Sequence, residues 1–215
     1  MIVCKAKKLY GEKLALDVDY SFEEGKIYAI IGNNGSGKST LLNVLAKQIR
    51  FEGEITLPGN VVYMTQAAYN FDFSVKQNVL LFVPKKDAQK RQDAERMMKE
   101  IGLDGLAKKN ANKLSGGEGQ KTALLRTLMQ DAKVLLLDEP TSSMDVTSTK
   151  IAEKLVFEYQ KKTGCTVFIV THSVAQAEAI ADEIFFFDSG KLVEHGKDIV
   201  QNPESEQLKT YLQTR

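Results

Sequence analysis

The chain has 215 residues, which is enough for one large domain with a sizeable buried core. Its apolar fraction of 43% and charged fraction of 27% are ordinary for a globular protein, and no apolar run is long enough to span a membrane. The net charge of +1 gives no reason to expect a nucleic acid or an acidic lipid as partner. The N-terminus lacks a signal peptide's apolar segment, and Cys4 and Cys165, which have no partner spacing, are expected to be buried free thiols. We therefore expect a cytoplasmic location.

The first sixty residues are rich in strand patterns. Alternating apolar residues over 14–22 predict a half-buried strand, and residues 2–8 are its expected neighbour. Residues 53–57 and 61–64 look like two strands joined across the turn residues 58–60. This part of the chain is therefore predicted to be rich in antiparallel pairing.

A glycine-rich loop interrupts this region. It follows the apolar run 27–31 and leads into a helical pattern at 41–46, and strand, glycine-rich loop and helix together are the context of a phosphate-binding loop. Glycines let the backbone wrap round an anion, and Lys38 would add a positive charge near the β- and γ-phosphates while the Ser39 hydroxyl would bind Mg²⁺. The loop comprises Gly32, Asn33, Asn34, Gly35, Ser36, Gly37, Lys38, Ser39 and Thr40. We infer that the chain binds a nucleoside triphosphate.

The character of the sequence changes over residues 67–113. A short apolar-periodic piece at 75–82 is broken by Pro84, and residues 85–100 form a strongly helical and heavily charged stretch. Its charges lie mostly on one face, which favours a solvated helix over a nucleic-acid surface. We predict that 67–113 is a helical subdomain inserted into the core.

The second half alternates strands with helices, which implies a parallel sheet covered on both faces. Ser115, with Glu118 three residues later, has the pattern of a capping box that opens a helix. An aliphatic strand at 134–137 then ends in Asp138 and Glu139. The remaining predicted elements are helices at 151–162, 174–181 and 204–213, a strand at 165–170, and a hairpin formed by 184–187 and 191–193.

Polar residues at the ends of these strands suggest the chemistry. Ligands of open α/β sheets bind beyond the carboxyl ends of the strands, so Asp138 can reach the Mg²⁺ held by Ser39. Glu139 is then placed to polarise a water for attack on the γ-phosphate. His172, at the end of the following strand, either donates a hydrogen bond to the phosphate or the water, or is merely a strand-end histidine. Gln66 follows the strand 61–64 and offers a neutral group that can touch Mg²⁺ or water.

This set of motifs resembles the ATP-binding subunit of an ATP-binding cassette (ABC) transporter over nearly the whole chain. The most specific match is Leu114, Ser115, Gly116, Gly117 and Glu118, which resembles the family's signature sequence. The resemblance implies an α/β fold with a P-loop NTPase core and parallel sheet, an N-terminal antiparallel β subdomain and an inserted helical subdomain. It divides a single ABC ATPase domain, 1–215, into residues 1–66, 67–113 and 114–215.

The resemblance also assigns roles to single residues. Tyr10 matches the aromatic residue that stacks on adenine, Glu139 the catalytic base and His172 the switch histidine. Ser115 and Gly117 match residues that contact the γ-phosphate bound to the opposite subunit. Gln66 matches the residue that senses the γ-phosphate, and Asp145 the acid of the loop between the two sites. The implied cofactors are ATP and Mg²⁺, with Ser39, Gln66 and Asp138 as metal ligands. Glu118 departs from the family, in which Gln is common at this position.

The family works as an ATP-sandwich dimer, so the implied partners are a second ATPase subunit, with a homodimer expected, and an integral membrane permease. An importer would add a solute-binding protein, and no nucleic acid is expected. The subunit would lie peripherally on the inner face of the cell membrane, through the permease. Phe71, Phe73 and Val75 either line a groove for a partner's helix or form the buried core of the insert. Residues 191–205 resemble importer ATPases for amino acids, phosphate or oxyanions such as tungstate, so import is favoured over export.

Two other functions are compatible with a phosphate loop. A soluble ABC ATPase could act in DNA repair, assembly or translation, but those relatives carry coiled-coil insertions or two cassettes, and this chain has neither. A small-molecule kinase is disfavoured because a water-activating Glu139 would waste ATP and the signature would be left unexplained. The sequence contains no feature that identifies the transported substrate.

Overall fold

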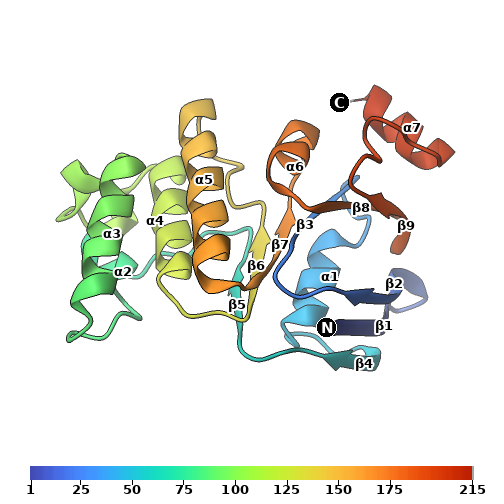
Figure 1. Ribbon diagram of the computed structural model, residues 1–215, viewed down its shortest axis with the longest axis horizontal. Coiled ribbons are helices and arrows are strands. Elements are labelled where there is room, and N and C mark those ends of the chain that lie inside the picture. The colour runs from blue at the N-terminus through green and yellow to red at the C-terminus, as the bar shows by residue number, and fades with distance from the viewer. Residues whose placement is uncertain (215) are drawn as a thin grey trace. The chain divides into compact units, whose positions relative to one another are not determined.

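The computed structural model describes residues 1–214 and divides into two compact units (Figure 1). The first unit comprises Met1–Tyr63, Ala132–Glu139 and Gly164–Arg215, and the second comprises Met64–Asp131 and Pro140–Thr163. The predicted boundaries of the helical subdomain, at residues 67 and 113, remain a prediction.

A mixed sheet organises the first unit. Its central strands β3, β6, β7 and β8 are parallel, whereas β1 pairs antiparallel with both β2 and β4, and β8 pairs antiparallel with β9. Over the described residues the order is β4-β1-β2-β9-β8-β3-β7-β6-β5. The strands are β1 (Ile2–Tyr10), β2 (Lys13–Phe22), β3 (Ile27–Gly32), β4 (Glu52–Thr56), β5 (Val61–Met64), β6 (Val134–Asp138), β7 (Thr166–Val170), β8 (Glu183–Asp188) and β9 (Lys191–Gly196). The α/β class with an antiparallel N-terminal region is confirmed.

The pairing of β4 and β5 differs from the antiparallel arrangement that the sequence suggested. Both strands form, but β4 pairs with β1 at one edge of the sheet while β5 lies beside β6 at the opposite edge. The carbonyl oxygen of Asn60 accepts hydrogen bonds from the N–H groups of Lys133 and Val134, at 3.1 and 3.2 Å. Residues 58–60 therefore lead the chain across to β6. Within the described residues, the N-terminal antiparallel region consists of β1, β2 and β4.

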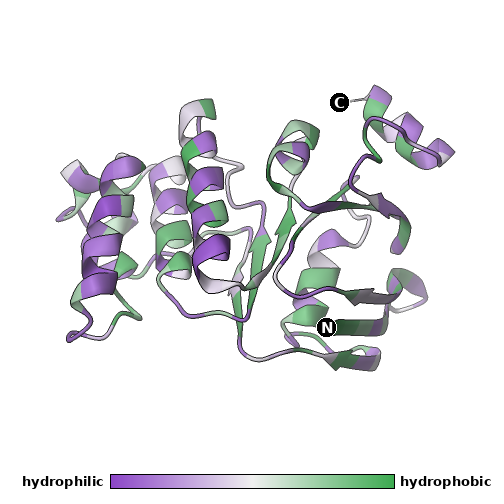
Figure 2. Ribbon diagram, in the orientation of Figure 1, coloured by the Kyte–Doolittle hydropathy of each residue, from purple (hydrophilic) through white to green (hydrophobic). Residues whose placement is uncertain are grey.

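The core of the first unit is apolar and aromatic. The ring of Phe22 packs edge-on against Tyr28 and Phe168, with centroids 5.1 and 4.9 Å apart. Helix α1 (Lys38–Leu45) packs against the sheet with four of its aliphatic side chains buried. Helix α6 (Val174–Ile180) packs against β3, and α7 (Glu206–Gln213) places Tyr211 5.3 Å from Phe186. Figure 2 shows this concentration of hydrophobic residues in the strands.

Cys4 and Cys165 are both buried free thiols, as the sequence predicted. Burial raises the pKa of the Cys4 thiol to about 12, with a contribution from Asp19. Within residues 1–214, no helix is both long enough and apolar enough to cross a bilayer.

The second unit is helical. Its helices are α2 (Val75–Val79), α3 (Ala88–Glu100), α4 (Gly116–Leu128) and α5 (Val146–Thr163), with short 3-10 turns at Asp104–Leu106 and Ala111–Lys113. The charged stretch predicted as a helix is α3, of which only Ala94, Met97 and Met98 are buried. Its remaining residues face solvent or the neighbouring helices, as the charge pattern indicated.

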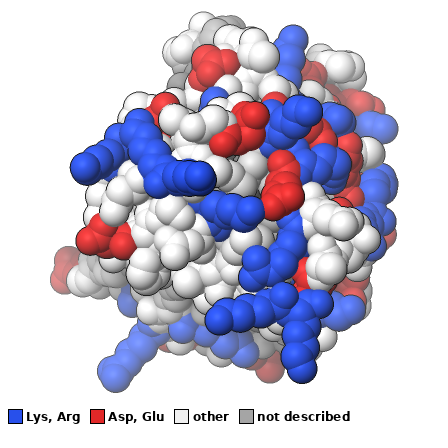
Figure 3. All heavy atoms as spheres, turned by 90° about the vertical axis from the view of Figure 1, so that its left-hand side faces the viewer, with Lys and Arg blue, Asp and Glu red and all other residues white. Residues whose placement is uncertain are grey.

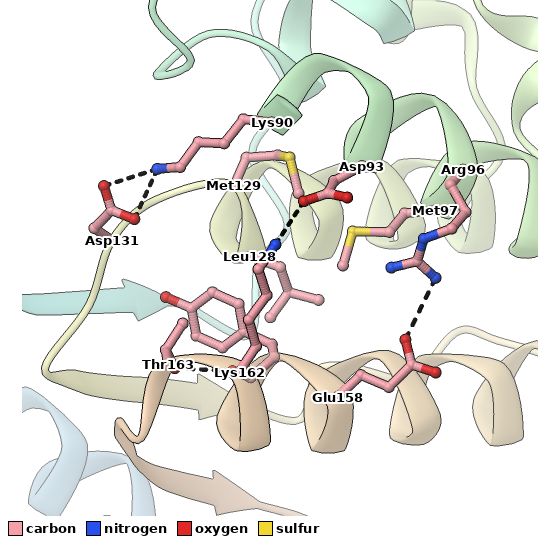
Figure 4. Close-up of a pocket in the computed structure, with 11 residues that line it drawn as sticks. Lys90, Asp93, Arg96, Met97, Leu128, Met129, Asp131, Glu158, Lys162 and Thr163 are labelled. Carbon is pink, nitrogen blue, oxygen red and sulfur yellow. Dashed lines mark hydrogen bonds and ion pairs between the residues drawn. The ribbon is translucent and has the colours of Figure 1, made fainter. Parts of the chain in front are cut away.

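A small cavity of about 170 Å³ lies between α3, α5 and the end of α4 (Figure 4). Met97, Leu128, Met129 and Tyr159 supply its buried apolar walls. Ion pairs bridge its mouth between Lys90 and Asp131 at 2.7 Å, Lys162 and Asp93 at 2.7 Å, and Arg96 and Glu158 at 3.3 Å. These pairs connect α3 to α5 and to the end of α4.

The Asp93–Lys162 pair predicts acid sensitivity of the second unit. The hydrogen bond from Lys162 holds the pKa of Asp93 below its ordinary value, so the pair stabilises the fold above that ordinary pKa and loses its effect as the pH falls. We expect Asp93→Asn to lower the free energy of unfolding by about 0.5–1 kcal/mol at pH 7, because Lys162 is exposed to solvent. The difference should narrow as the pH falls below about 4 in urea unfolding measured from pH 7 downward. The ion pair would have no stabilising role if the loss of unfolding free energy in Asp93→Asn did not change with pH. The same conclusion would follow if that loss equalled the loss in the exposed control Asp104→Asn.

Candidate active site

The phosphate loop is tightly enclosed within the first unit. Gly32 has φ of 145°, and a Cβ there would lie 2.2 Å from the carbonyl oxygen of Phe187. Gly37 has φ of 105°, and its Cβ would lie 2.7 Å from the carbonyl oxygen of Ala15. Only glycine fits these two positions, because β2 and β8 press on the loop from both sides.

Three observations show that this loop suits a polyphosphate. Lys38 is 5% exposed, and its Nζ donates hydrogen bonds of 2.8 Å to the carbonyl oxygens of Gly32 and Asn33, which holds the ammonium beside the loop. The buried Oγ of Ser36 has no hydrogen-bond partner among residues 1–214. Helix α1 begins after Gly37 without a side-chain cap, whereas α2, α3, α4, α6 and α7 each have one in the part of the chain described. Its first N–H groups are thus available to an anion.

Asp138 lies at the end of β6, beside the start of α1. Its Oδ1 accepts a 3.2 Å hydrogen bond from the Ser39 hydroxyl, and its Oδ2 accepts one of 3.4 Å from the Tyr63 hydroxyl. Burial, at 3% exposure, raises the pKa of Asp138; the hydrogen bond from Ser39 lowers it and the charge of Glu139 raises it. A carboxylate and a hydroxyl are hard oxygen ligands that fit a Mg²⁺ sharing its remaining positions with phosphate and water. No group of three or more His, Cys, Asp or Glu that could hold a metal ion by itself occurs among the described residues.

Glu139 and His172 meet at the carboxyl ends of adjacent strands. The Oε1 of Glu139 lies 2.5 Å from the Nε2 of His172, and the Glu139 side chain is 11% exposed. The Glu139 backbone has φ of 50°, a left-handed conformation that is strained for a residue with a Cβ, and its N–H donates to the carbonyl oxygen of Val170 at 3.0 Å. The buried Nδ1 of His172 has no hydrogen-bond partner in residues 1–214. A carboxylate held in this way can accept a proton from a water.

Tyr10 ends β1 in the first unit, and its ring is 56% exposed. The Nζ of Lys8 lies 4.9 Å from the ring centroid. An exposed ring offers a face for stacking on a base, so this position is compatible with the predicted adenine contact. That role stays a prediction.

The other predicted site residues belong to the second unit. Gln66 is exposed and lies two residues after the end of β5, and its predicted role stays a prediction. Ser115 caps α4: its Oγ accepts a 3.3 Å hydrogen bond from the Glu118 N–H, and Glu118 Oε2 accepts one of 2.9 Å from the Ser115 N–H. The predicted capping box is therefore confirmed. A Cβ at Gly117 would lie 2.7 Å from the carbonyl oxygen of Ser143, so this glycine permits close packing.

Asp145 lies at the start of α5 in the same unit. Its carboxylate accepts hydrogen bonds of 2.8 and 2.7 Å from the N–H and hydroxyl of Ser148. The backbone hydrogen bond from Ser148 is the main cause of its lowered pKa. Asp145 thus stabilises the helix start, whatever further contact it makes.

Two residues near these groups were missed by the sequence analysis. Tyr63 holds the Asp138 carboxylate, and its place in the alternating strand 61–64 was the only signal for it. Gln120 is 2% exposed, donates to the Ser142 hydroxyl at 3.0 Å and accepts from the Ser143 N–H at 2.8 Å. A glutamine on the apolar face of a predicted helix could have indicated this buried role.

Comparison with known proteins places the chain in a family. The family model described as ABC transporter matches residues 15–142. The chain belongs to the ABC transporter family. This ABC subunit is 37% identical over 205 residues to the tungstate uptake system ATP-binding protein TupC of Peptoclostridium acidaminophilum, covering 89% of this chain and 96% of the relative. It is 34% identical over 199 residues to the aliphatic sulfonates import ATP-binding protein SsuB 2 of Paracoccus denitrificans (strain Pd 1222), covering 91% and 80%.

Solved structures agree with this assignment. The ABC subunit matches the dimeric structure of the bacterial ABC transporter cassette MJ0796 with a TM-score of 0.80 at 25% identity, over 92% of this chain and 98% of that one. The ADP conformation of the cassette MJ1267 matches with a TM-score of 0.76 at 23% identity, over 97% of each chain, which supports the fold alone. The expected family and fold are confirmed, and the chain is an ATP-binding ABC ATPase subunit coupled to transport.

The buried Asp138 carboxylate predicts a stability gain when its charge is removed. Because the pKa of Asp138 is raised in the folded protein, the neutral carboxyl stabilises the fold at a pH below the ordinary pKa of Asp. This contribution to the free energy of unfolding is lost as the pH rises through the pKa of the folded state. In EDTA and without nucleotide, Asp138→Asn should raise the melting temperature at pH 7.5 by about 2–4 °C, the shift that about 1 kcal/mol produces in a chain of this size. The gain should shrink toward about pH 4. The exposed control Asp17→Asn should show no such pH dependence, and a lower melting temperature for Asp138→Asn at pH 7.5 would refute the expectation.

Proposed function

We propose that this ABC ATPase energises the uptake of an oxyanion through a separate membrane permease, working as a dimer with ATP bound between its subunits. The observation that supports the catalytic part is the contact between Glu139 and His172. It lies at the carboxyl ends of β6 and β7, and the phosphate loop follows the carboxyl end of the neighbouring strand β3. Similarity to uptake ATPases over nearly the full chain supports the transport part.

Residues of the first unit perform the chemistry in this proposal. The loop Gly32–Thr40 binds the triphosphate through its N–H groups and Lys38, and Tyr10 stacks on the adenine. Ser39 and Asp138 would hold the Mg²⁺, which neutralises phosphate charge when bound.

Glu139 accepts a proton from the attacking water, and its strained backbone and the His172 contact fix the carboxylate in position. His172 in turn donates a hydrogen bond toward the γ-phosphate once nucleotide is bound. The two side chains therefore act as a unit in hydrolysis.

The signature segment completes the site of a second copy. Ser115 and Gly117 contact the γ-phosphate bound to the partner, and Asp145 lies in the loop between the two sites. The segment consists of Leu114, Ser115, Gly116, Gly117 and Glu118. Two equivalent contacts of this kind would make a homodimer the active form, and the dimeric structure of the MJ0796 cassette supports this arrangement.

A groove in the second unit suits the permease. It encloses a volume of about 400 Å³ lined by Phe73, Leu80 and Leu81, with Lys76, Gln77 and Arg91 beside them. Phe73 is 45% exposed, whereas Val75 is fully buried, so the predicted groove residues divide between surface and core. Figure 3 shows that basic side chains surround uncharged surface on the side of α2 and α3. An amphipathic cytoplasmic helix of the permease would fit here and hold the subunit on the inner face of the membrane.

The names of the relatives, a tungstate uptake protein and an aliphatic sulfonates import protein, support import, and tungstate and sulfonates both carry oxyanion groups. A solute-binding protein outside the membrane would then deliver the cargo. The neutral chain gives no support for a nucleic-acid partner.

The assignment of the catalytic base is tested by Glu139→Gln. The amide cannot accept the proton of water, so we expect ATP hydrolysis to fall by at least about 100-fold while ATP binding is retained. The variant should form a stable dimer with ATP in analytical ultracentrifugation, and no dimer without ATP. Normal turnover would exclude Glu139 as the base, and a monomer at saturating ATP would exclude the dimeric mechanism.

The identity of the transported compound can be tested by measuring uptake in cells. A strain that lacks this chain should lose most of its uptake of tungstate or of an alkanesulfonate, and the wild-type chain, but not Glu139→Gln, should restore it. Unchanged uptake of both compounds would refute oxyanion import. Increased accumulation of either compound in the strain lacking the chain would indicate export instead.

A further inference from the structure

A short segment of the second unit, residues 107–111, lies between the start of α2 and the start of α4. The carbonyl oxygen of Lys109 accepts a 3.0 Å hydrogen bond from the N–H of Val75, and that of Ala107 accepts one of 3.0 Å from the N–H of Lys76. The N–H of Ala111 donates to the carbonyl oxygen of Phe73 at 2.9 Å. The backbone of Lys109 is thus fixed on both sides by the beginning of α2.

The side chain of Lys109 reaches the cap of α4. Its Nζ lies 3.4 Å from the Oε2 of Glu118, the same oxygen that accepts the N–H of Ser115 at 2.9 Å. The Lys109 and Glu118 side chains are 37% and 31% exposed. The hydrogen bond from the Ser115 N–H is the main cause of the lowered pKa of Glu118, and Lys109 adds to it. Glu118 is therefore an anion at neutral pH.

This anion stands in the segment that must approach phosphate. The carboxylate shares a hydrogen-bonded cap with Ser115, which in the proposed dimer contacts the γ-phosphate of the second copy. Like charges brought together as solvent is excluded repel strongly. A cation on the same oxygen cancels this repulsion without releasing the carboxylate from the Ser115 N–H.

We propose that Lys109 is a positioning residue of the ATPase: it neutralises Glu118 and holds it on the cap, so that Ser115 can face the triphosphate of the partner copy. This inference rests on the proposed dimeric function. Lys109 itself need not touch ATP.

A double-mutant cycle with Lys109→Met and Glu118→Gln tests the proposal. At about 50 mM salt, Lys109→Met should lower kcat/KM for ATP about tenfold, because an uncompensated charge remains at the cap. In the Glu118→Gln background the same substitution should change kcat/KM less than about twofold, since no charge is left to neutralise. Raising the salt to about 300 mM should reduce the defect of the single variant. The neighbouring exposed Lys108→Met is the matched control and should leave activity unchanged.

ATP-dependent dimerisation, measured with Glu139→Gln added to each variant, provides a second readout. Lys109→Met should weaken the dimer only when residue 118 is Glu. An equal effect of Lys109→Met in both backgrounds would mean a purely structural role, and no effect with Glu118 present would also overturn the proposal. Failure of the Glu139→Gln chain alone to dimerise would instead refute the dimeric function.

Discussion

The enclosure of the phosphate loop is the constraint on which the first unit depends. The backbone of β8 and that of β2 approach Gly32 and Gly37 so closely that neither position can carry a side chain. The turn between β8 and β9 completes this clamp, since the N–H of Gly190 donates to the Ser36 carbonyl oxygen at 3.0 Å. Strands from the two ends of the chain must therefore be in place before the loop has its shape. The sheet order, with β9 and β8 between β2 and β3, meets that requirement.

Two adjacent carboxylates then acquire different properties from their surroundings. Asp138 ends a buried strand, and burial favours its neutral form unless a cation is present. Glu139 turns away in a left-handed backbone conformation and meets His172. The change of backbone direction between the two residues places their carboxylates in different surroundings, which suits the proposed division between metal binding by Asp138 and proton acceptance by Glu139. Local strain of this kind persists where the surrounding structure fixes the backbone, here through the pairing of Asp138 with Val170 and the hydrogen bond from the Glu139 N–H to the Val170 carbonyl oxygen.

Local patterns explain how much the sequence could predict. Period-two alternation, the aliphatic run 134–137 and the capping box at Ser115 are short-range signals, and the corresponding elements form within a few residues of their predicted bounds. The phosphate loop and the Asp138–Glu139 pair were likewise visible as contiguous motifs. The edge position of β5, the hydrogen bond from Tyr63 to Asp138 and the burial of Val75 were not, because each depends on residues distant in sequence. No pattern of residue types signalled the left-handed backbone at Glu139.

The starts of α1 and α4 satisfy their first backbone N–H groups in opposite ways. Helix α1 has no side-chain cap in residues 1–214, so its first N–H groups depend on a ligand or water for satisfaction. Helix α4 is closed by the reciprocal bonds of Ser115 and Glu118, so its cap is formed before any nucleotide arrives. In the proposed dimer, the α1 start of one copy would bind the triphosphate, and the preformed α4 start of the other copy would face its γ-phosphate. In the proposed dimer, the Glu118 charge that closes this cap gives the nearby Lys109 cation its proposed role.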